Sequence, residues 1–204
     1  MKSLSRLIVF GAALVCLASI GAGAFATQGA PVTASSPVLL TSCGQSPGPE
    51  RVLFFLKRQK ANHEFLAQAK AEDLIDRQKA GNPYKTVIIV TGASLKGMGA
   101  AGVSMTDELK RTAALIAEAK RQGLTIIGAH VEGMARRAQG AAPGDNSDEL
   151  SIDAVMPLSD LMIVRQDGNE DKRFTVISEN KRIALTLFEK NMELGDVLTR
   201  IFGK

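Results

Sequence analysis

Short, continuously apolar segments recur along this chain, and each is followed by a stretch whose apolar residues have helical spacing. Residues 87–90 and 161–164 show the pattern best, because they contain no polar residue at all. Such segments are typical of strands that helices cover on both faces. Strands that alternate with helices build a parallel sheet. We therefore predict an α/β fold, a doubly wound and mostly parallel sheet of five or six strands in a Rossmann-like or flavodoxin-like three-layer sandwich.

The individual elements follow from the same patterns and from local helix signals. Strands are predicted at residues 38–41, 87–90, 124–129, 161–164 and 183–188, with a further uncertain strand near 64–67. Helices are predicted from Pro49, over 71–79, from Ser104 or Thr106 to about Gln122, over 148–156, within 171–180, and at the C-terminus around 197–202. Proline and hydroxyl residues suit the first positions of a helix, which explains where two of these helices start.

The N-terminus has the composition of an export signal. Lys2 and Arg6 precede an apolar run over residues 7–20, and Ala24-Phe25-Ala26 fits the small-x-small rule of signal cleavage. We expect a signal peptide at residues 1–26, a flexible leader at 27–36 and a single α/β domain at 37–204. The protein is then periplasmic or extracellular, with no stable membrane insertion after cleavage. An uncleaved N-terminal anchor is the alternative, since the apolar stretch is just long enough to span a bilayer.

Charge and composition narrow the partners. The chain has 25 basic and 21 acidic residues, and Lys2 and Arg6 leave with the predicted signal, so the mature protein is close to neutral. Tryptophan is absent and there is a single tyrosine, which argues against base stacking and hence against nucleic acid as a partner. Cys43 is the one cysteine expected to remain after cleavage of Cys16, so no internal disulfide is expected. The sequence indicates no cofactor and no metal site.

A glycine-rich turn after the strand at 87–90 marks the best place to look for a site. Ligands of doubly wound folds bind beyond the carboxyl ends of the strands, where the strand order reverses. The turn Thr91-Gly92-Ala93-Ser94 resembles that of short-chain dehydrogenases. However, its glycine spacing differs, and the catalytic Tyr-x-x-x-Lys pair is missing. We predict instead that backbone N–H groups with Ser94, Lys96, Gly97 and Gly99 hold a small anion. The alternative is a close-packed turn that needs glycine for its conformation.

Two further loops are predicted at the same edge. Ser42, Gln45 and Ser46 follow the first strand and offer neutral hydrogen-bonding groups, and Cys43 among them is interpreted as a small loop residue rather than a nucleophile. His130 and Glu132 follow the strand at 124–129 and are expected on the same side of an extended segment.

Arg136 and Arg137 come shortly after this pair. The group is either an acid/base pair with an anion clamp or a surface ion pair, and it has too few ligands for a structural zinc. We expect these loops to bind a small anionic or polar ligand. A hydrolase that uses His130 or Glu132 as its base, or a non-catalytic protein that binds an envelope partner, is the alternative.

Three stretches together resemble an uncharacterised family of secreted bacterial α/β proteins. They are Pro37-Val38-Leu39-Leu40-Thr41-Ser42-x-Gly44-Gln45-Ser46-Pro47, residues 94–102, and Ile127-Gly128-x-His130-Val131-Glu132-Gly133. The resemblance spans most of the mature chain. It implies export and the α/β fold, and it transfers no catalytic residue. It also implies a small residue such as alanine at the position of Cys43.

Overall fold

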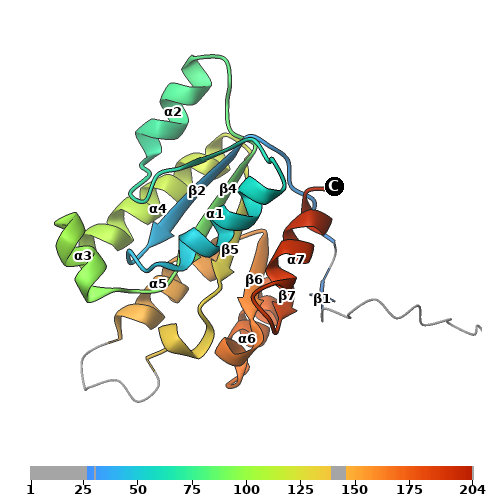
Figure 1. The fold of residues 1–204 in the computed structure, drawn as a ribbon. Coiled ribbons are helices and arrows are strands. Elements are labelled where there is room, and N and C mark those ends of the chain that lie inside the picture. The colour runs from blue at the N-terminus through green and yellow to red at the C-terminus, as the bar shows by residue number, and fades with distance from the viewer. Residues whose placement is uncertain (1–26, 30, 139–145, 204) are drawn as a thin grey trace, which may run out of the picture.

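The computed structural model describes residues 27–29, 31–138 and 146–203 (Figure 1). The predicted signal peptide, residues 1–26, lies outside these ranges, as does the middle of the long loop after residue 138. In the described ranges, no helix has both the length and the apolar character needed to cross a membrane.

Within the described residues, seven strands form one sheet in the order β1-β7-β6-β5-β4-β2-β3. The strands are β1 (Thr27–Gln28), β2 (Val38–Cys43), β3 (His63–Phe65), β4 (Thr86–Thr91), β5 (Thr125–His130), β6 (Leu161–Arg165) and β7 (Ala184–Phe188). All neighbours are parallel except β1, which runs antiparallel to β7. The predicted mostly parallel sheet is confirmed. The chain moves outward from β2 to β3 and then returns to the other side of β2 as β4, so the strand order reverses between β2 and β4.

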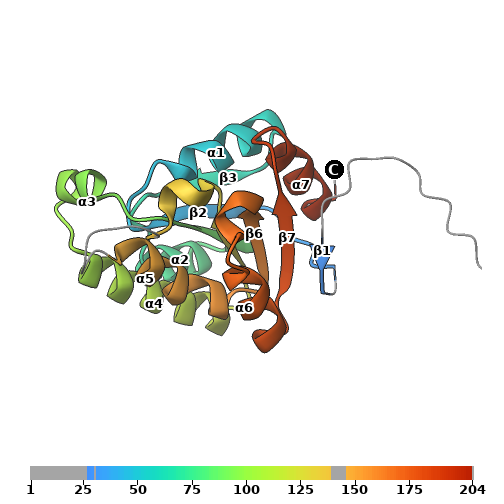
Figure 2. The ribbon, with the colours of Figure 1, turned by 90° about the horizontal axis from the view of Figure 1, so that it is seen from below.

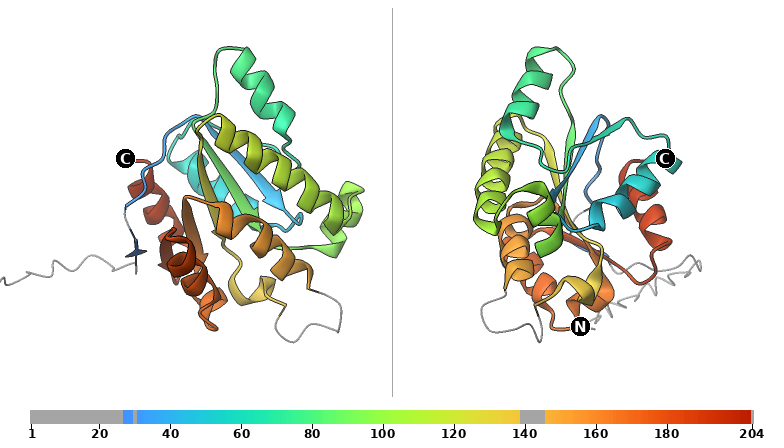
Figure 3. Two further views of the ribbon diagram at one scale, coloured as in Figure 1. Left: turned by 180° about the vertical axis from the view of Figure 1, so that it is seen from behind. Right: turned by 60° about the vertical axis from the view of Figure 1, so that its left-hand side comes forward.

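Helices cover both faces of this sheet, as the end-on views show (Figure 2; Figure 3, right). One layer consists of α1 (Gly48–Arg58) and α7 (Glu193–Ile201). The other layer consists of α2 (Ala71–Lys79), α4 (Met105–Arg121), α5 (Ser147–Val155) and α6 (Arg173–Lys181). A short helix, α3 (Leu95–Ala101), lies near the carboxyl ends of β2 and β4, beyond the helical layers. The three-layer sandwich is therefore confirmed.

The core explains why the strands are continuously apolar. Leu40 and Val90 pack with α1 and α7 in one cluster, whereas Leu39 and Ile89 pack on the opposite face with Leu115 of α4. Every residue of β2 and β4 is buried. Since successive strand residues face opposite layers, both must be apolar, and each large side chain buried in this way stabilises the fold by about 1.5–3 kcal/mol.

Local helix signals are confirmed where they are complete. Helix α2 has the predicted bounds, and Ser104 is the N-cap of α4, with Asp107 completing a capping box. The uncertain strand near 64–67 exists as β3. Helix α3 was not predicted, because Gly97 and Gly99 within its seven residues lower its helix propensity.

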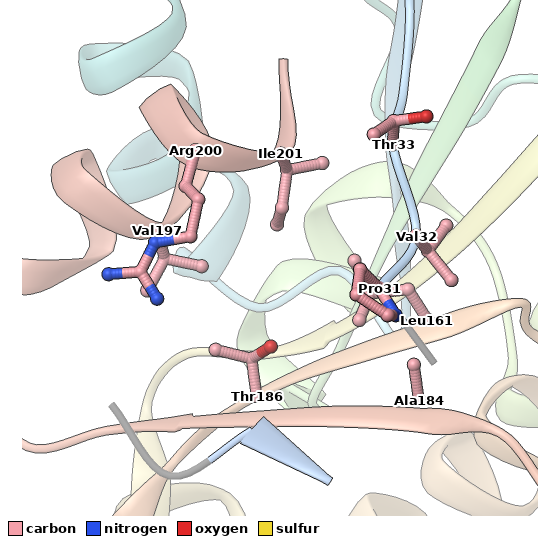
Figure 4. A pocket seen from close by; sticks show the side chains of 9 residues that line it. All are labelled: Pro31, Val32, Thr33, Leu161, Ala184, Thr186, Val197, Arg200 and Ile201. Atoms are coloured by element: carbon pink, nitrogen blue, oxygen red, sulfur yellow. The ribbon is translucent and has the colours of Figure 1, made fainter. Parts of the chain in front are cut away.

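The expected flexible leader, residues 27–36, lies along the domain wherever it is described. Strand β1 pairs with the outer edge of β7, and the N–H of buried Ala34 donates to Ile201 O at 2.9 Å. Pro31 and Val32 line a small cavity of about 100 Å³ together with Val197 and Ile201 of α7 (Figure 4). The open edge of β7 offers unpaired backbone groups, and the N-terminal segment occupies them.

Candidate functional site

The loops that follow β2 and β4 meet at the carboxyl edge of the sheet. Cys43 and Thr91 are paired in register, so both strands end at the same level. Beyond them, the Ser94 N–H donates to Gly44 O at 2.7 Å, and Gln45 forms an isolated bridge with Ala93. A Cβ on Gly44 would stand 2.6 Å from Gly92 O, so a glycine is required at Gly44 for the loops to approach this closely. The two loops are therefore hydrogen-bonded to each other at the point where the strand order reverses.

The glycine-rich turn does not present the anion cradle that we predicted. The Ala93 N–H already donates to Asp148 Oδ1 at 2.6 Å, and the Gly92 N–H donates to Ser151 Oγ at 3.0 Å. Both acceptors belong to α5, so a carboxylate of the same chain occupies the position expected for the ligand. The alternative of a close-packed turn describes this segment better.

The residues that follow the turn either form hydrogen bonds within the chain or are exposed to solvent. Ser94 Oγ caps α3 by accepting a hydrogen bond from the Gly97 N–H at 3.0 Å, and a Cβ on Gly97 would collide with Gln45 O. Lys96 and Gly99 are exposed on α3, and no atom lies within 4 Å of the Cβ position of Gly99. The structure thus does not bring the hydroxyl of Ser94 and the side chain of Lys96 together around an anion.

A buried ion pair beneath the β2–α1 loop sets the conformation of that loop. Glu108 of α4 is fully buried, lies 2.9 Å from Arg111 Nε, and accepts hydrogen bonds from Gly44 N at 2.8 Å and Gln45 Nε2 at 2.9 Å. Burial raises the pKa of Glu108, but the hydrogen bonds from Arg111, Gly44 and Gln45 outweigh burial and hold the pKa below its usual value. Arg111 also donates to the carbonyls of Ser42 and Ala69.

This pair was missed in the sequence. The feature of the sequence that could have revealed it is a charged pair at spacing i, i+3 on the face of α4 that also carries Thr112 and Leu115, both fully buried. Of the predicted loop residues, Gln45 is therefore bound to Glu108 and to Ala67 O, and it takes part in shaping the loop.

A polar cluster lies where α1 begins, at the same carboxyl edge. We define the crevice cluster as Ser46, Gly48, Gly92, Glu132 and Arg136. A Cβ on Gly48 would stand 2.9 Å from Glu132 Oε2 and 3.2 Å from Ser46 Oγ, and a Cβ on Gly92 would stand 3.0 Å from Ser46 Oγ and 3.2 Å from Arg136 Cγ. Residues from the loops after β2, β4 and β5 thus meet at one point, as the sequence predicts for Ser46, Glu132 and Arg136.

The polar atoms of this cluster are only partly satisfied. Glu132 is 5% exposed, and its buried Oε2 has no hydrogen-bond partner among residues 27–29, 31–138 and 146–203, while its Oε1 lies 3.4 Å from Arg136 Nε. Arg136 donates from Nη1 to Ala93 O at 2.8 Å, and its side chain is 26% exposed. Ser46 Oγ accepts a hydrogen bond from the Gly48 N–H at 3.3 Å. Ser42 Oγ, which is buried near the end of β2, also has no partner within the part of the chain that the structure describes.

His130 lies apart from Glu132, so our prediction that both face the same side is wrong. His130 ends β5 and is fully buried, with Nδ1 3.1 Å from Thr91 Oγ1 and Nε2 3.0 Å from Gly133 O. Its ring packs on Phe174, with the ring centroids 5.1 Å apart. Glu132 has helical backbone angles, so the alternation of an extended strand stops before it. Burial lowers the pKa of His130 to about 4.

Arg137 stabilises the surroundings of the cluster and offers no free anion clamp. Its guanidinium is paired with Glu149 at 2.7 Å and with Asp171 at 2.6 Å, and it donates to Gly168 O. Burial lowers the pKa of Arg137, but hydrogen bonds and charges from Asp171 and Glu149 outweigh burial and raise it. The side chain ties η1 (Gly133–Arg136), α5 and η3 (Gln166–Asn169) to one another.

Cys43 faces the interior, as expected for a small residue at this position. It is fully buried, and burial is the main reason that its pKa is raised to about 11. Among the described residues, no group of three histidine, cysteine, aspartate or glutamate side chains is placed to hold a metal ion.

A separate groove of about 420 Å³ lies between the first turns of α1 and the residues just before α7. It is lined by Pro47, Glu50, Arg51, Phe54, Phe55, Asn191 and Met192. Phe54 and Met192 are more than half exposed there, and Arg51 Nη1 donates to Asn191 Oδ1 at 3.1 Å across the groove. None of these residues belongs to the crevice cluster.

Comparisons with known proteins bear on the family of this chain. A family model described as a domain of unknown function, DUF6305, matches residues 35–202. A search of curated proteins found no match.

Three solved structures are among those to which the chain is distantly similar. An acetyl xylan esterase, AlAXEase, is 12% identical, with a TM-score of 0.38 over 80% of this chain and 97% of that chain. The psychrotrophic esterase EstA from Pseudoalteromonas sp. is 12% identical, with a TM-score of 0.33 over 75% and 78% of the two chains. A GDSL-like lipase from Bacteroides thetaiotaomicron VPI-5482 is 13% identical, with a TM-score of 0.31 over 74% and 66%. At these values the likenesses transfer no chemistry to this chain.

Proposed function

Because the chain belongs to the DUF6305 family, whose function is unknown, we propose a function from the geometry of the crevice cluster: the protein binds a small polar ligand through Glu132, Arg136 and Ser46. The site lies at the carboxyl ends of β2 and β4, where the strand order reverses. Ligands of doubly wound sheets bind at this point.

The observation that carries the proposal is the unpartnered Oε2 of Glu132. Most buried polar atoms have a hydrogen-bond partner, and leaving one without a partner costs about 1–3 kcal/mol, more for a charged group. Glu132 is 5% exposed, and no residue that the structure describes donates a hydrogen bond to its Oε2. A ligand that brings an N–H or O–H group to this oxygen removes the cost.

Arg136 and Ser46 complete the site. Nη2 of Arg136 makes no bond to a described residue, and the side chain is exposed enough to meet a ligand. The Ser46 hydroxyl accepts from Gly48 N and keeps its own hydrogen for donation. The cluster therefore offers one strong acceptor and two donors. This composition favours a polar ligand with both kinds of group over a plain anion.

The hydrolase alternative receives no support from His130. A carbonyl can only accept, so Nε2 of His130 carries the proton that is donated to Gly133 O, and Nδ1 faces the Thr91 hydroxyl. Both nitrogens are thus engaged inside the core. We do not propose catalysis for this site.

Ligand-induced thermal stabilisation tests the proposal. The purified protein is screened against amino acids, hydroxy acids, simple carboxylates, phosphate and sugars, and the compounds that raise the melting temperature are measured by isothermal titration. We expect Glu132→Gln and Arg136→Met to weaken binding at least about tenfold, a loss of about 1.4 kcal/mol. Lys96→Ala, on exposed α3, is the matched control and should bind like the wild type. A screen without any binder, or variants that bind normally, would contradict the proposal.

A further inference from the structure

The geometry of the crevice cluster points to the class of ligand: we propose that the site takes a small α-amino acid, with its ammonium group on Glu132 and its carboxylate on Arg136. The inference rests on the proposed function and concerns the same site.

The spacing of the two charged groups sets the spacing of the ligand groups. Glu132 Oε1 and Arg136 Nε belong to one ion pair, 3.4 Å apart. The remaining oxygen, Oε2, and the remaining nitrogen, Nη2, are attached to the same two head groups, so they also lie close together. A ligand that serves both must therefore carry its donor and its acceptor on neighbouring atoms. An α-amino acid meets this condition, and an amino acid with its two groups far apart does not.

The charge of the site favours a ligand with both signs. The cluster contains one carboxylate and one guanidinium, and the carboxylate is 95% buried. A plain carboxylate ligand would pair with Arg136 but place its negative charge against Glu132, and a plain amine would do the reverse. A zwitterion pairs with both groups and leaves no buried charge unbalanced, and hydrogen bonds between charged groups are stronger than neutral ones. A 2-hydroxy acid has the right spacing, but its hydroxyl brings no charge to Glu132.

Two glycines let the backbone pack closely against the polar side chains of the site. Gly48 and Gly92 bring bare backbone up to Glu132, Ser46 and Arg136, and a methyl group on Gly48 would stand 2.9 Å from both Glu132 Oε2 and Val90 Cγ1. The backbone of Gly48 therefore lies directly against the Glu132 carboxylate, and the added methyl group of Gly48→Ala should push that carboxylate out of its present position.

Isothermal titration with a matched set of small probes tests the inference. The set consists of glycine and alanine, lactate, acetate, methylamine, and γ-aminobutyrate, whose amine and carboxylate lie far apart. We expect at least one of the two α-amino acids to bind about tenfold or more tightly than every other probe. Glu132→Gln, Arg136→Met and Gly48→Ala should each remove this preference, with Lys96→Ala as the control that retains it.

The outcomes separate the two proposals. If acetate binds as tightly as the α-amino acids, and Glu132→Gln and Arg136→Met still weaken its binding, the site takes a plain carboxylate and the argument for a zwitterion is wrong. If γ-aminobutyrate or lactate binds as well as the α-amino acids, the argument from spacing or from charge is wrong. In each of these cases the inference fails while the proposed function stands. If no probe binds, and the wider screen also finds no ligand, both fail.

Discussion

Glu108 Oε2 accepts a hydrogen bond from the backbone N–H of Gly44 at 2.8 Å, so a fully buried carboxylate of α4 holds the loop that follows β2. The same carboxylate is paired with Arg111, whose other hydrogen bonds go to the carbonyls of Ser42 in β2 and of Ala69 between β3 and α2. The position of Ser46 in the crevice therefore depends on a charge that lies in the opposite helical layer.

Replacing Glu108 should destabilise the protein strongly. Glu108→Gln leaves Arg111, whose side chain is 9% exposed, without its charged partner, and breaking a pair buried to this extent costs about 3–5 kcal/mol. The free energy of unfolding in urea measures the effect. Asp76→Asn, which removes an exposed pair with Lys79, is the matched control and should change the stability little. Equal effects in the two variants would show that the buried pair is not a stabilising element.

His130 should make the stability dependent on pH below neutrality. Its pKa is about 4 in the folded protein and about 6.5 when unfolded, so the unfolded state binds the proton more tightly. The stabilisation is complete above pH 6.5 and is lost as the pH falls through 4, by up to about 3 kcal/mol. Urea unfolding between pH 4.5 and 7 measures this slope. His130→Gln should flatten it, and an unchanged slope would assign the dependence to other groups.

Cys43 should be unreactive in the native protein. The thiol is fully buried and its pKa is raised to about 11, so little thiolate exists at pH 8. We expect no labelling by a thiol reagent at pH 8 until denaturant unfolds the chain, when one equivalent reacts. The experiment uses a Cys16→Ser variant so that a single thiol is counted. Rapid labelling of the folded protein would revive Cys43 as a candidate nucleophile.

Removing the carboxylate of Glu132, whose Oε2 has no partner among the described residues, should stabilise the protein while abolishing binding. Glu132→Met keeps a similar side-chain length but removes the buried Oε2, so the free energy of unfolding should rise by about 1 kcal/mol. Arg136 loses its partner at little cost, because it is partly exposed and keeps its bond to Ala93 O. Thermal and urea unfolding, each with and without ligand, measure both effects. A loss of stability would mean that Glu132 is a structural residue.

The strands and most helices could be predicted because their signals are local. A run such as residues 87–90 is apolar at every position, which only a strand covered on both faces requires, and Ser104 with Asp107 forms a capping box within four residues. Both features set the conformation of the backbone within a few residues of themselves. Distant parts of the chain therefore do not change the secondary structure that they predict.

The site could be predicted only in part, because its contacts join residues that are far apart in the chain. The expectation that ligands bind where β2 and β4 end named Ser46, Glu132 and Arg136 together. However, the turn at Gly92 and Ala93 is filled by Asp148 and Ser151, which lie more than fifty residues further on. The sequence near the turn gives no indication of these two acceptors.

The sequence by itself determined the α/β class, the positions of the strands and the edge at which a site should lie, since periodicity and caps are short-range properties. Tertiary structure decided which polar groups at that edge remain available. It buried His130 against Phe174 and left Glu132 Oε2 without a partner, although the two residues are separated by a single valine. The extended backbone of β5 ends at His130, and Glu132 already has helical backbone angles, so the two side chains face different surroundings. Which groups surround each side chain depends on the packing of distant helices.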